Sequence, residues 1–467
     1  MIKKNNFLLL FCLLLISVSA QDKKTAYDND MLPASFHADK RQALRDKMDG
    51  NSVAIIFANA ERNRSNDVDY QYSQDPNFYY LTGLTEPNAV LLIFKERITI
   101  DSITCNEILF VQPRNEKAES WTGKRLGTTG AIKELGFRFA YNNFEFDEFP
   151  LDFARFATIY HPTNHNDARD DKYDSGDLFS LLKSFEDKTA KLKEKKNASS
   201  LFSFMSALRE IKSPEELKLL QKAIDITCDA HLDLMKSLDS TMTEYQAQAL
   251  VEFGFKFNGS EYVGYPSIVG AGENSCILHY ITNRKKFENP EMLVVDAGAE
   301  YHGYTADVTR TLPVNGKFSK EQAEIYNIVL KAQEEGIKAC KKGNNFRDPH
   351  NAAVDVIKKK LVDLGIIIDP NDFIKYFFHG TSHYLGLDVH DAGTYSKLKV
   401  NSVITVEPGI YIPAGSPCDK KWWNIGIRIE DDVLITDGEP VVMSGKLPKT
   451  VAEIEKLMKE EGILKKN

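Results

Sequence analysis

The chain has 467 residues, of which 42% are hydrophobic, and it carries 59 lysine and arginine residues against 67 aspartate and glutamate residues. A chain of this length can bury a large core and usually divides into two domains. The mildly acidic balance argues against a nucleic acid as partner. The one Lys-rich stretch, 183–196, does not change this conclusion, since it is typical of a solvated helix and linker.

The N-terminus has the pattern of a secretory signal. Lys3 and Lys4 precede an apolar run from Phe7 to Ile16, and small residues lead up to Ala20. An uncleaved anchor is the alternative, but it would need about 20 apolar residues to cross a bilayer. The sequence therefore predicts that residues 1–20 are removed and that the protein is exported, periplasmic or secreted, with no stable membrane insertion afterwards.

The cysteines indicate neither disulfides nor zinc. Of the 6 in the chain, Cys12 would leave with the signal, and the rest are an odd, scattered set without a Cys-x-x-Cys pair. A disulfide framework or a thiolate zinc site would need closer and paired spacing.

Residues 31–200 alternate apolar runs with short helical stretches. The runs 52–58, 88–94 and 107–113 are typical of buried strands, and the region is therefore expected to form an α/β domain. A polar, Lys- and Ser-rich connection over 187–200 then places a domain boundary near residue 200.

Residues 201–467 carry strong helix-start signals. Ser213, Thr243 and Ser319 each open a capping-box pattern, and Gly343 and Gly365 are stop signals. We expect helices over 213–238, 243–257, 319–342 and 349–365, and strands over 291–297, 304–311, 402–407, 426–431 and 432–436. This order predicts an α+β domain with helices outside a curved, mostly antiparallel sheet.

Five ionisable residues lie in apolar or Gly- and Pro-rich stretches of this second region. A carboxylate buried without a partner would cost several kcal/mol, so each such position calls for a cation or a hydrogen-bonded partner. A metal cluster would meet all of these costs at once, as in a two-metal hydrolase. The residues are Asp296, Asp307, His383, Glu407 and Glu430.

Strand geometry lets these residues converge. Side chains two apart share a face of a strand, so Arg428 and Glu430 are expected to point the same way. Asp296 and Asp307 are joined by a Gly- and Tyr-rich turn. Two neighbouring antiparallel strands could therefore bring both carboxylates onto one pair of cations.

Histidines accompany the carboxylates. The segment 379–391 holds three of them, His379, His383 and His390, and no glutamate follows His379, so this is not the helical His-Glu-x-x-His zinc motif. A set of four carboxylates and one imidazole is rich in oxygen. It favours Mn²⁺, with Co²⁺ or Zn²⁺ as alternatives.

Each residue alone has a plainer interpretation. Asp307 could cap a turn, Glu407 could sit in a loop before Pro408, and Glu430 could form a structural pair with Arg428. The joint occurrence of all five with three further histidines favours the metal centre.

At these residues the chain resembles the pita-bread metallopeptidases, specifically the aminopeptidase P family. The resemblance implies a creatinase-like N-terminal domain and a pita-bread catalytic domain. The stretches that carry it are 76–87, 121–127, 268–280, 294–319, 379–391, 405–412 and 426–432.

The resemblance implies a role for each ligand-type residue. Asp296, Asp307 and Glu430 would hold one ion, and Asp307, His383, Glu407 and Glu430 the other, with Asp307 and Glu430 bridging. A hydroxide between the ions would attack the peptide carbonyl, since two cations lower the pKa of bound water and stabilise the developing oxyanion.

It also implies roles around the ions. His279, His379 and His390 match histidines that bind the scissile carbonyl, the proline side of the substrate and the tetrahedral intermediate. Glu407 would also transfer a proton, and Arg428 would orient a ligand carboxylate.

Two tyrosines, Tyr265 and Tyr411, match substrate-side tyrosines of the family. In the family a neighbouring subunit often shapes the cleft, which favours a homo-oligomer, a dimer or a tetramer. The expected activity is release of the first residue from peptides with proline second. The alternatives are a prolidase, which cuts Xaa-Pro dipeptides, and a metal-free pita-bread protein that is a binding module or a creatinase-like enzyme.

Overall fold

The structure is a computed structural model that describes residues 29–163 and 167–463. Residues 1–20, for which a secretory signal is predicted, lie outside the described residues. Among the residues described, no helix is both long and apolar enough to cross a membrane. The described residues from Leu32 onward form one compact unit, so the domain boundary near residue 200 stays a prediction.

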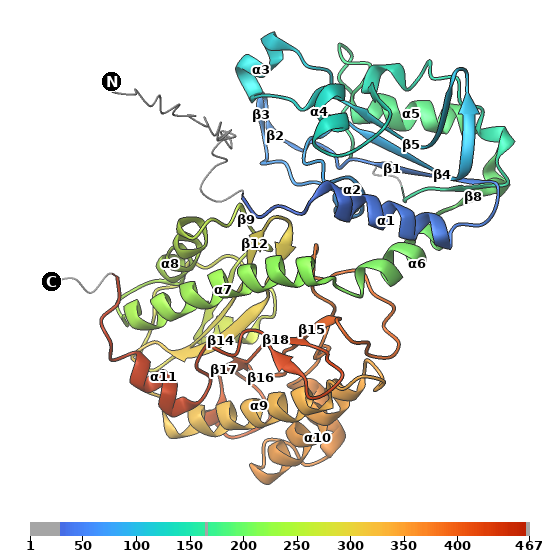
Figure 1. Ribbon diagram of the computed structural model, residues 1–467. Helices are drawn as coiled ribbons and strands as arrows, with labels where there is room; N and C mark the ends of the chain where they lie inside the picture. Colours follow the sequence, from blue (N-terminus) through green and yellow to red (C-terminus); the bar gives the residue numbers. More distant parts are fainter. Residues whose placement is uncertain (1–28, 164–166, 464–467) are drawn as a thin grey trace, which may run out of the picture. The chain divides into compact units, whose positions relative to one another are not determined.

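A six-stranded sheet organises the N-terminal part of the chain (Figure 1). The three strands predicted from apolar runs are confirmed as its central members β1, β4 and β5. Pairing is antiparallel between β1 and β4 and between β4 and β5, and parallel elsewhere. In spatial order the strands are β6 (Ala140–Asn142), β5 (Ile103–Val111), β4 (Val90–Ile100), β1 (Ser52–Phe57), β7 (Thr158–Tyr160) and β8 (Lys196–Asn197).

The apolar run of β1 is buried along its whole length because both faces of the sheet are covered. Ala54 and Ile56 belong to a core shared with helices α1 (Ala34–Lys47) and α2 (Pro76–Thr82). The intervening residues Val53, Ile55 and Phe57 belong to a second core, shared with α5 (Leu178–Thr189). Because successive side chains of a strand point to opposite faces of the sheet, β1 contributes alternate residues to each of the two cores.

Smaller elements complete this part of the chain. They are the β2–β3 hairpin (Asn63–Ser65 and Val68–Asp69), α3 (Glu116–Thr122) and α4 (Gly127–Lys133). The helix α6 (Ala198–Arg209) begins inside the connection expected over 187–200, and β8 of the same connection pairs with β7. Much of that stretch is therefore regular structure.

The helices of the C-terminal part begin where the sequence predicts. Ser213, Thr243 and Ser319 each form a capping box, in which the side chain accepts from a backbone N–H of the first turn. The third helix ends at Ala339, earlier than expected. The helices are α7 (Pro214–Ser237), α8 (Glu244–Phe257), α9 (Lys320–Ala339), α10 (Asp348–Asp363) and α11 (Val451–Leu457).

The expected antiparallel pairing is confirmed, with the strands distributed over four small sheets. Figure 1 shows several of these strands between α7 and α9. The sheets are β10-β11-β14 (Ile268–Ala271, Met292–Ala297, Val308–Pro313), β13-β12-β9 (Tyr304–Thr305, Ala299–Tyr301, Tyr262–Val263), β15-β18-β19 (Val403–Val406, Asp431–Leu434, Val441–Val442) and β16-β17 (Gly409–Ile412, Ile425–Arg428).

Two expected strands are interrupted. The segment 304–311 divides into β13 and β14 at Asp307, and 426–431 stops after Arg428, so that Glu430 precedes β18. The reason is tertiary: the Asp307 N–H donates to Asp432 Oδ2 (3.3 Å) and the Glu430 N–H donates to Thr309 O (3.1 Å). Both predicted ligands therefore lie at breaks between strands.

Candidate metal centre

Strand pairing brings the first two carboxylates together. β11 and β14 are antiparallel, with Asp296 opposite Thr309, and Asp307 directly precedes β14. Gly298 permits this approach, because a Cβ there would lie 1.8 Å from the Ala306 carbonyl oxygen. The Tyr265 hydroxyl, 2.5 Å from Asp296 Oδ1, also bonds to Asp307 and so links the two carboxylates.

The loop that carries His383 runs along β15. The Thr405 N–H donates to the His383 carbonyl (3.0 Å), and the Glu407 N–H donates to the Thr381 carbonyl (2.9 Å). These backbone bonds fix His383 beside Glu407, which directly follows β15. His383 Nε2 lies 3.5 Å from Glu407 Oε1.

All five predicted residues gather in this region, and three of them form its tightest group. Asp307, His383 and Glu430 each offer a ligand atom within 4.8 Å of the others. His383 Nε2 lies 3.3 Å from Asp307 Oδ2. Asp296 and Glu407 lie outside this group of three. Asp296 is connected to Asp307 by the shared Tyr265 hydroxyl, and Glu407 pairs with His383 directly.

The donor set fits divalent cations. His383 donates from Nδ1 to the Tyr384 carbonyl (3.0 Å), which leaves Nε2 directed at Asp307 and Glu407. A metal-binding histidine usually has this second bond on its other nitrogen. Carboxylate oxygens and one imidazole are a ligand set for Mn²⁺, Co²⁺ or Zn²⁺.

Electrostatics point the same way. Burial, and next the charges of Asp307 and Glu407, raise the pKa of Glu430 well above its usual range. Burial raises the pKa of Glu407 to about 7 and also raises that of Asp296, although Arg428 opposes the second shift. These carboxylates repel one another in a poorly solvated space, which a cation would relieve.

His383 and Asp307 are the exception, because they face each other. Burial is the largest single effect and opposes the charged form of both, but their mutual hydrogen bond and charge attraction, together with other neighbours such as Glu407 beside His383, outweigh it. As a result, the pKa of Asp307 is lowered and that of His383 is raised to about 9.

A second layer of polar groups holds the candidate ligands. Arg428, 3% exposed, donates from Nη2 to Asp296 Oδ2 (2.6 Å) and from Nη1 to the Tyr411 hydroxyl (3.1 Å). The Tyr411 hydroxyl lies 2.9 Å from Nε2 of His379, whose Nδ1 donates to the Gly380 carbonyl. Because Nδ1 carries the proton, Tyr411 donates to Nε2.

Sequence reasoning gave no role to Thr309 and Asp432. The Thr309 hydroxyl donates to Glu430 Oε2 (2.6 Å), and Asp432 is fully buried behind Asp307. The alternation along 305–309, which places Thr309 on the face of Asp307, was the available signal for the first. The run of acidic residues after Glu430 was the signal for the second.

A cavity of about 300 Å³ opens onto this centre. His279 and His390 line it and, among the described residues, accept or donate no hydrogen bond. The His390 ring lies 4.3 Å from that of His383, centroid to centroid. Seven of the predicted site residues line the cavity. Tyr265, Asp307 and Tyr411 bond to or pair with lining residues, and a ligand atom of Glu430 lies within 4.8 Å of one of His383.

The fold and this site define a class. Residues 218–437 match the model of metallopeptidase family M24, and residues 37–159 match that of the aminopeptidase P N-terminal domain. Family M24 membership implies divalent metal ions, in agreement with the donor set.

Individual relatives narrow the class. The chain is 35% identical over 442 residues to the Xaa-Pro aminopeptidase of Haemophilus influenzae, covering 91% of this chain and 98% of that one. The Pseudomonas aeruginosa aminopeptidase PepP superposes with a TM-score of 0.82 at 34% identity, over 92% and 98% of the two chains. A zinc-substituted Escherichia coli aminopeptidase P in complex with product gives a TM-score of 0.82 at 34% identity, over 91% and 98%. The chain belongs to the Xaa-Pro aminopeptidase family of metallopeptidases.

Proposed function

We propose that this protein is a metal-dependent aminopeptidase that releases the N-terminal residue from peptides with proline in the second position. The observation that carries the proposal is the convergence of Asp307, His383 and Glu430, with Asp296 and Glu407 beside them, in a member of the Xaa-Pro aminopeptidase family. A dedicated enzyme is needed because the proline nitrogen has no N–H and its φ is fixed.

The ligand assignment is the one that the family resemblance implies. Asp296, Asp307 and Glu430 would hold one ion, and Asp307, His383, Glu407 and Glu430 the other. When bound, two divalent ions lower the pKa of water and stabilise negative charge on a carbonyl oxygen. The oxygen-rich set favours Mn²⁺, and the zinc-substituted relative makes Zn²⁺ the first alternative.

The chain's own residues prepare this site. Arg428 fixes Asp296, Thr309 fixes Glu430, and the Tyr384 carbonyl fixes the ring of His383. We assign proton transfer to Glu407, because its carboxylate lines the cavity beside His383.

The histidines divide into two kinds. His279 and His390 have no hydrogen-bond partner among the described residues and can donate to a peptide carbonyl. Both nitrogens of His379 already have hydrogen-bond partners, Gly380 and Tyr411. Burial lowers the pKa of His379 to about 3, so the ring is neutral and forms one side, or wall, of the cavity. Phe378 extends that wall by packing against Tyr411, which suits the apolar proline ring.

The test is hydrolysis of Ala-Pro-Ala by the purified protein, before and after metal removal and after addition of Mn²⁺. Metal-stimulated release of alanine is expected, and its failure with every divalent ion would defeat the proposal. Comparison with the dipeptide Ala-Pro separates the aminopeptidase from a prolidase, which would cut only the dipeptide.

The metal itself is tested by elemental analysis of the protein as isolated. We expect two divalent ions per chain, with the highest activity for Mn²⁺ after reconstitution. A metal-free active protein would favour the creatinase-like alternative.

We also propose export and self-association. The support for export is the signal pattern that ends at Ala20, and a mature chain that begins at Gln21 would establish it. The support for a homo-oligomer is the family resemblance. Light scattering that gives the mass of one chain would rule it out.

A further inference from the structure

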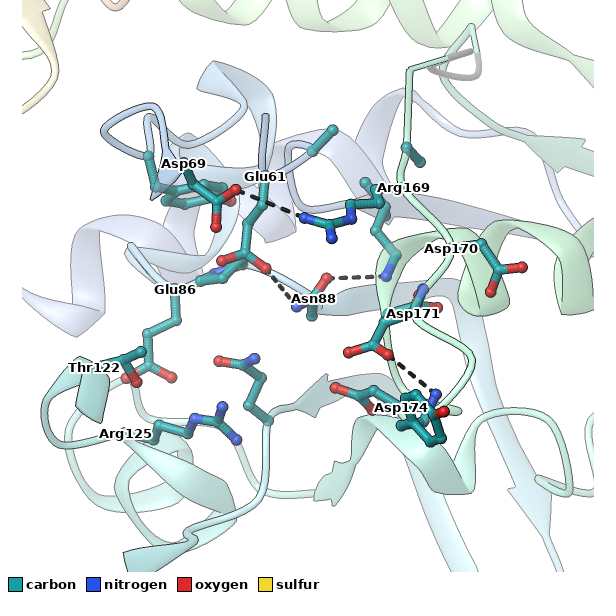
Figure 2. Close-up of a pocket in the computed structure, with 18 of the residues that line it drawn as sticks. Glu61, Asp69, Glu86, Asn88, Thr122, Arg125, Arg169, Asp170, Asp171 and Asp174 are labelled. Carbon is teal, nitrogen blue, oxygen red and sulfur yellow. Dashed lines mark hydrogen bonds and ion pairs between the residues drawn. The ribbon is translucent and has the colours of Figure 1, made fainter. Parts of the chain in front are cut away.

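A second, larger cavity lies in the N-terminal part of the chain, and none of the candidate site residues lines it. Its volume is about 640 Å³, within the usual range of about 300–1,000 Å³ for small-molecule sites. It is open to solvent on one side and is lined by the segments that follow β1, β5 and α3 and by those that precede β4 and α5. Figure 2 shows Glu61, Glu86, Arg125 and Asp174 around it.

Polar groups without partners face this cavity. Gln112 is only 7% exposed, lines the cavity and makes no side-chain hydrogen bond to another described residue. Glu86 Oε1 accepts from the Leu126 N–H (2.6 Å), but Oε2 is buried without a partner. Leaving such groups unsatisfied is costly, so native proteins rarely keep them without a ligand or water.

The charges are mixed in sign. Glu61 accepts one bond, from Asn88 Nδ2 to Oε2 (2.9 Å), and its Oε1 has no described partner. The Arg125 guanidinium likewise forms no hydrogen bond or ion pair with the described residues, although it attracts both Glu61 and Glu86. The cavity thus offers carboxylate acceptors for a cationic group, guanidinium donors for an anionic group, and the side-chain amide of Gln112 for hydrogen bonds to a peptide amide.

A single metal ion does not match this arrangement. The one described group of three or more ligand-type residues close enough to hold an ion is Asp307, His383 and Glu430. The carboxylates of the N-terminal cavity are therefore spread too widely for an ion and suit a ligand of several polar groups.

We propose that this cavity binds a short peptide by its charged ends. Glu61 and Glu86 receive the ammonium group, Arg125 receives the carboxylate, and Gln112 pairs with an amide between them. Burial raises the pKa of both glutamates, a cost that a bound ammonium group offsets.

The experiment is calorimetric titration of the metal-loaded protein with glycylglycine, which has no proline. We expect one saturable site that Arg125→Met weakens at least about tenfold, since hydrogen bonds to charged groups are strong. Gln112→Leu, which preserves volume, should weaken it as well and provides a second test if the first variant does not fold. Arg97→Met removes an exposed arginine outside the cavity and should leave binding unchanged.

A further variant separates this cavity from the metal centre. Asp307→Asn should retain glycylglycine binding, because Asp307 does not line the cavity. Loss of binding in Asp307→Asn, or full binding in Arg125→Met and Gln112→Leu, would overturn the proposal. So would absence of binding to the unaltered protein.

Two simpler probes test the class of ligand. 1,4-Diaminobutane carries only ammonium groups and acetate only a carboxylate, so each should bind at least about tenfold more weakly than glycylglycine. Equal binding of either one would overturn the assignment of a zwitterionic ligand.

Discussion

Glu430 and Asp431 are neighbours in the chain, and both are buried, yet they meet opposite surroundings. Asp431 accepts from Arg310 Nη2 (2.8 Å) and from Lys449 Nζ (3.0 Å), as well as from neutral donors. Burial opposes its ionisation, but the two cations outweigh it and hold the pKa of Asp431 well below its usual range. Here the chain supplies its own counter-charge.

Glu430 receives no such partner. Its side chain accepts a hydrogen bond from the Thr309 hydroxyl, while burial and the charges of Asp307 and Glu407 raise its pKa. Two adjacent carboxylates thus differ in their neighbours: Asp431 begins β18 beside Arg310 and Lys449, whereas Glu430 precedes that strand and lies beside Asp307 and Glu407. The comparison teaches that a buried carboxylate without a cationic side chain beside it indicates a site where a bound cation supplies the counter-charge.

The largest expected effect comes from Glu430→Gln. Glu430 is proposed to bind both ions, so its loss should reduce metal content. We expect kcat/KM to fall by more than about 10–100-fold, which is the usual cost of losing a residue that only orients a metal ligand. Elemental analysis and Ala-Pro-Ala hydrolysis measure the two effects. Glu439→Gln, at an exposed ion pair, is the matched control. Full activity in Glu430→Gln would show that Glu430 is not a metal ligand.

Asp431→Asn should act on stability instead. It leaves Arg310, which is fully buried, without its counter-charge, and such a loss costs about 3–5 kcal/mol. Urea unfolding measures the change, with the exposed Asp437→Asn as control. If Asp431→Asn removed metal and left stability intact, the contrast between the two neighbours would collapse.

Tyr411→Phe breaks the hydrogen-bonded link between Arg428 and His379 while keeping the ring. We expect kcat/KM to fall about 10–100-fold, as for other groups that position a ligand or a substrate-binding residue, with metal content unchanged. Tyr245→Phe, at an exposed ring, is the control. Unchanged kinetics would show that the link has no catalytic consequence.

Acid should weaken the paired carboxylates. Asp391 bonds to Arg209 and to Lys212 Nζ (2.7 Å), and these cations outweigh burial and lower its pKa. The unfolded state therefore binds more protons, so this stability is complete above about pH 3.8 and is lost as the pH falls below that value. Each such group contributes up to about 1.4 kcal/mol per pH unit.

Urea unfolding between pH 6 and pH 3 tests this dependence. In Asp391→Asn the decline at acid pH should be shallower, although the starting stability is lower. An equally steep decline in the variant would assign the acid sensitivity to other groups.

The smallest effect is expected for Cys276→Ser. Burial raises the pKa of the Cys276 thiol to about 11, so it is not an ionised nucleophile at neutral pH. Activity should change less than about twofold, because the thiolate is the reactive form of cysteine. A large loss in a folded variant would show that the assigned chemistry is incomplete.

Local patterns predicted the elements well. The apolar run 52–58 is β1, and the capping boxes at Ser213, Thr243 and Ser319 open α7, α8 and α9, because these features depend on neighbours in the chain. The prediction of one continuous strand over 304–311 was wrong. The strand breaks at Asp307, whose N–H bonds to Asp432 from a distant segment.

The sequence by itself determined which residue types the candidate site would contain, since carboxylates and histidines in apolar stretches need a shared partner. It did not determine that Asp307, His383 and Glu430 form the tightest group, that Arg428 bonds to Asp296 rather than to Glu430, or that Gln112 and Arg125 face one cavity. Those facts join residues far apart in the chain. Only the pairing of strands and the packing of loops decides which of them meet.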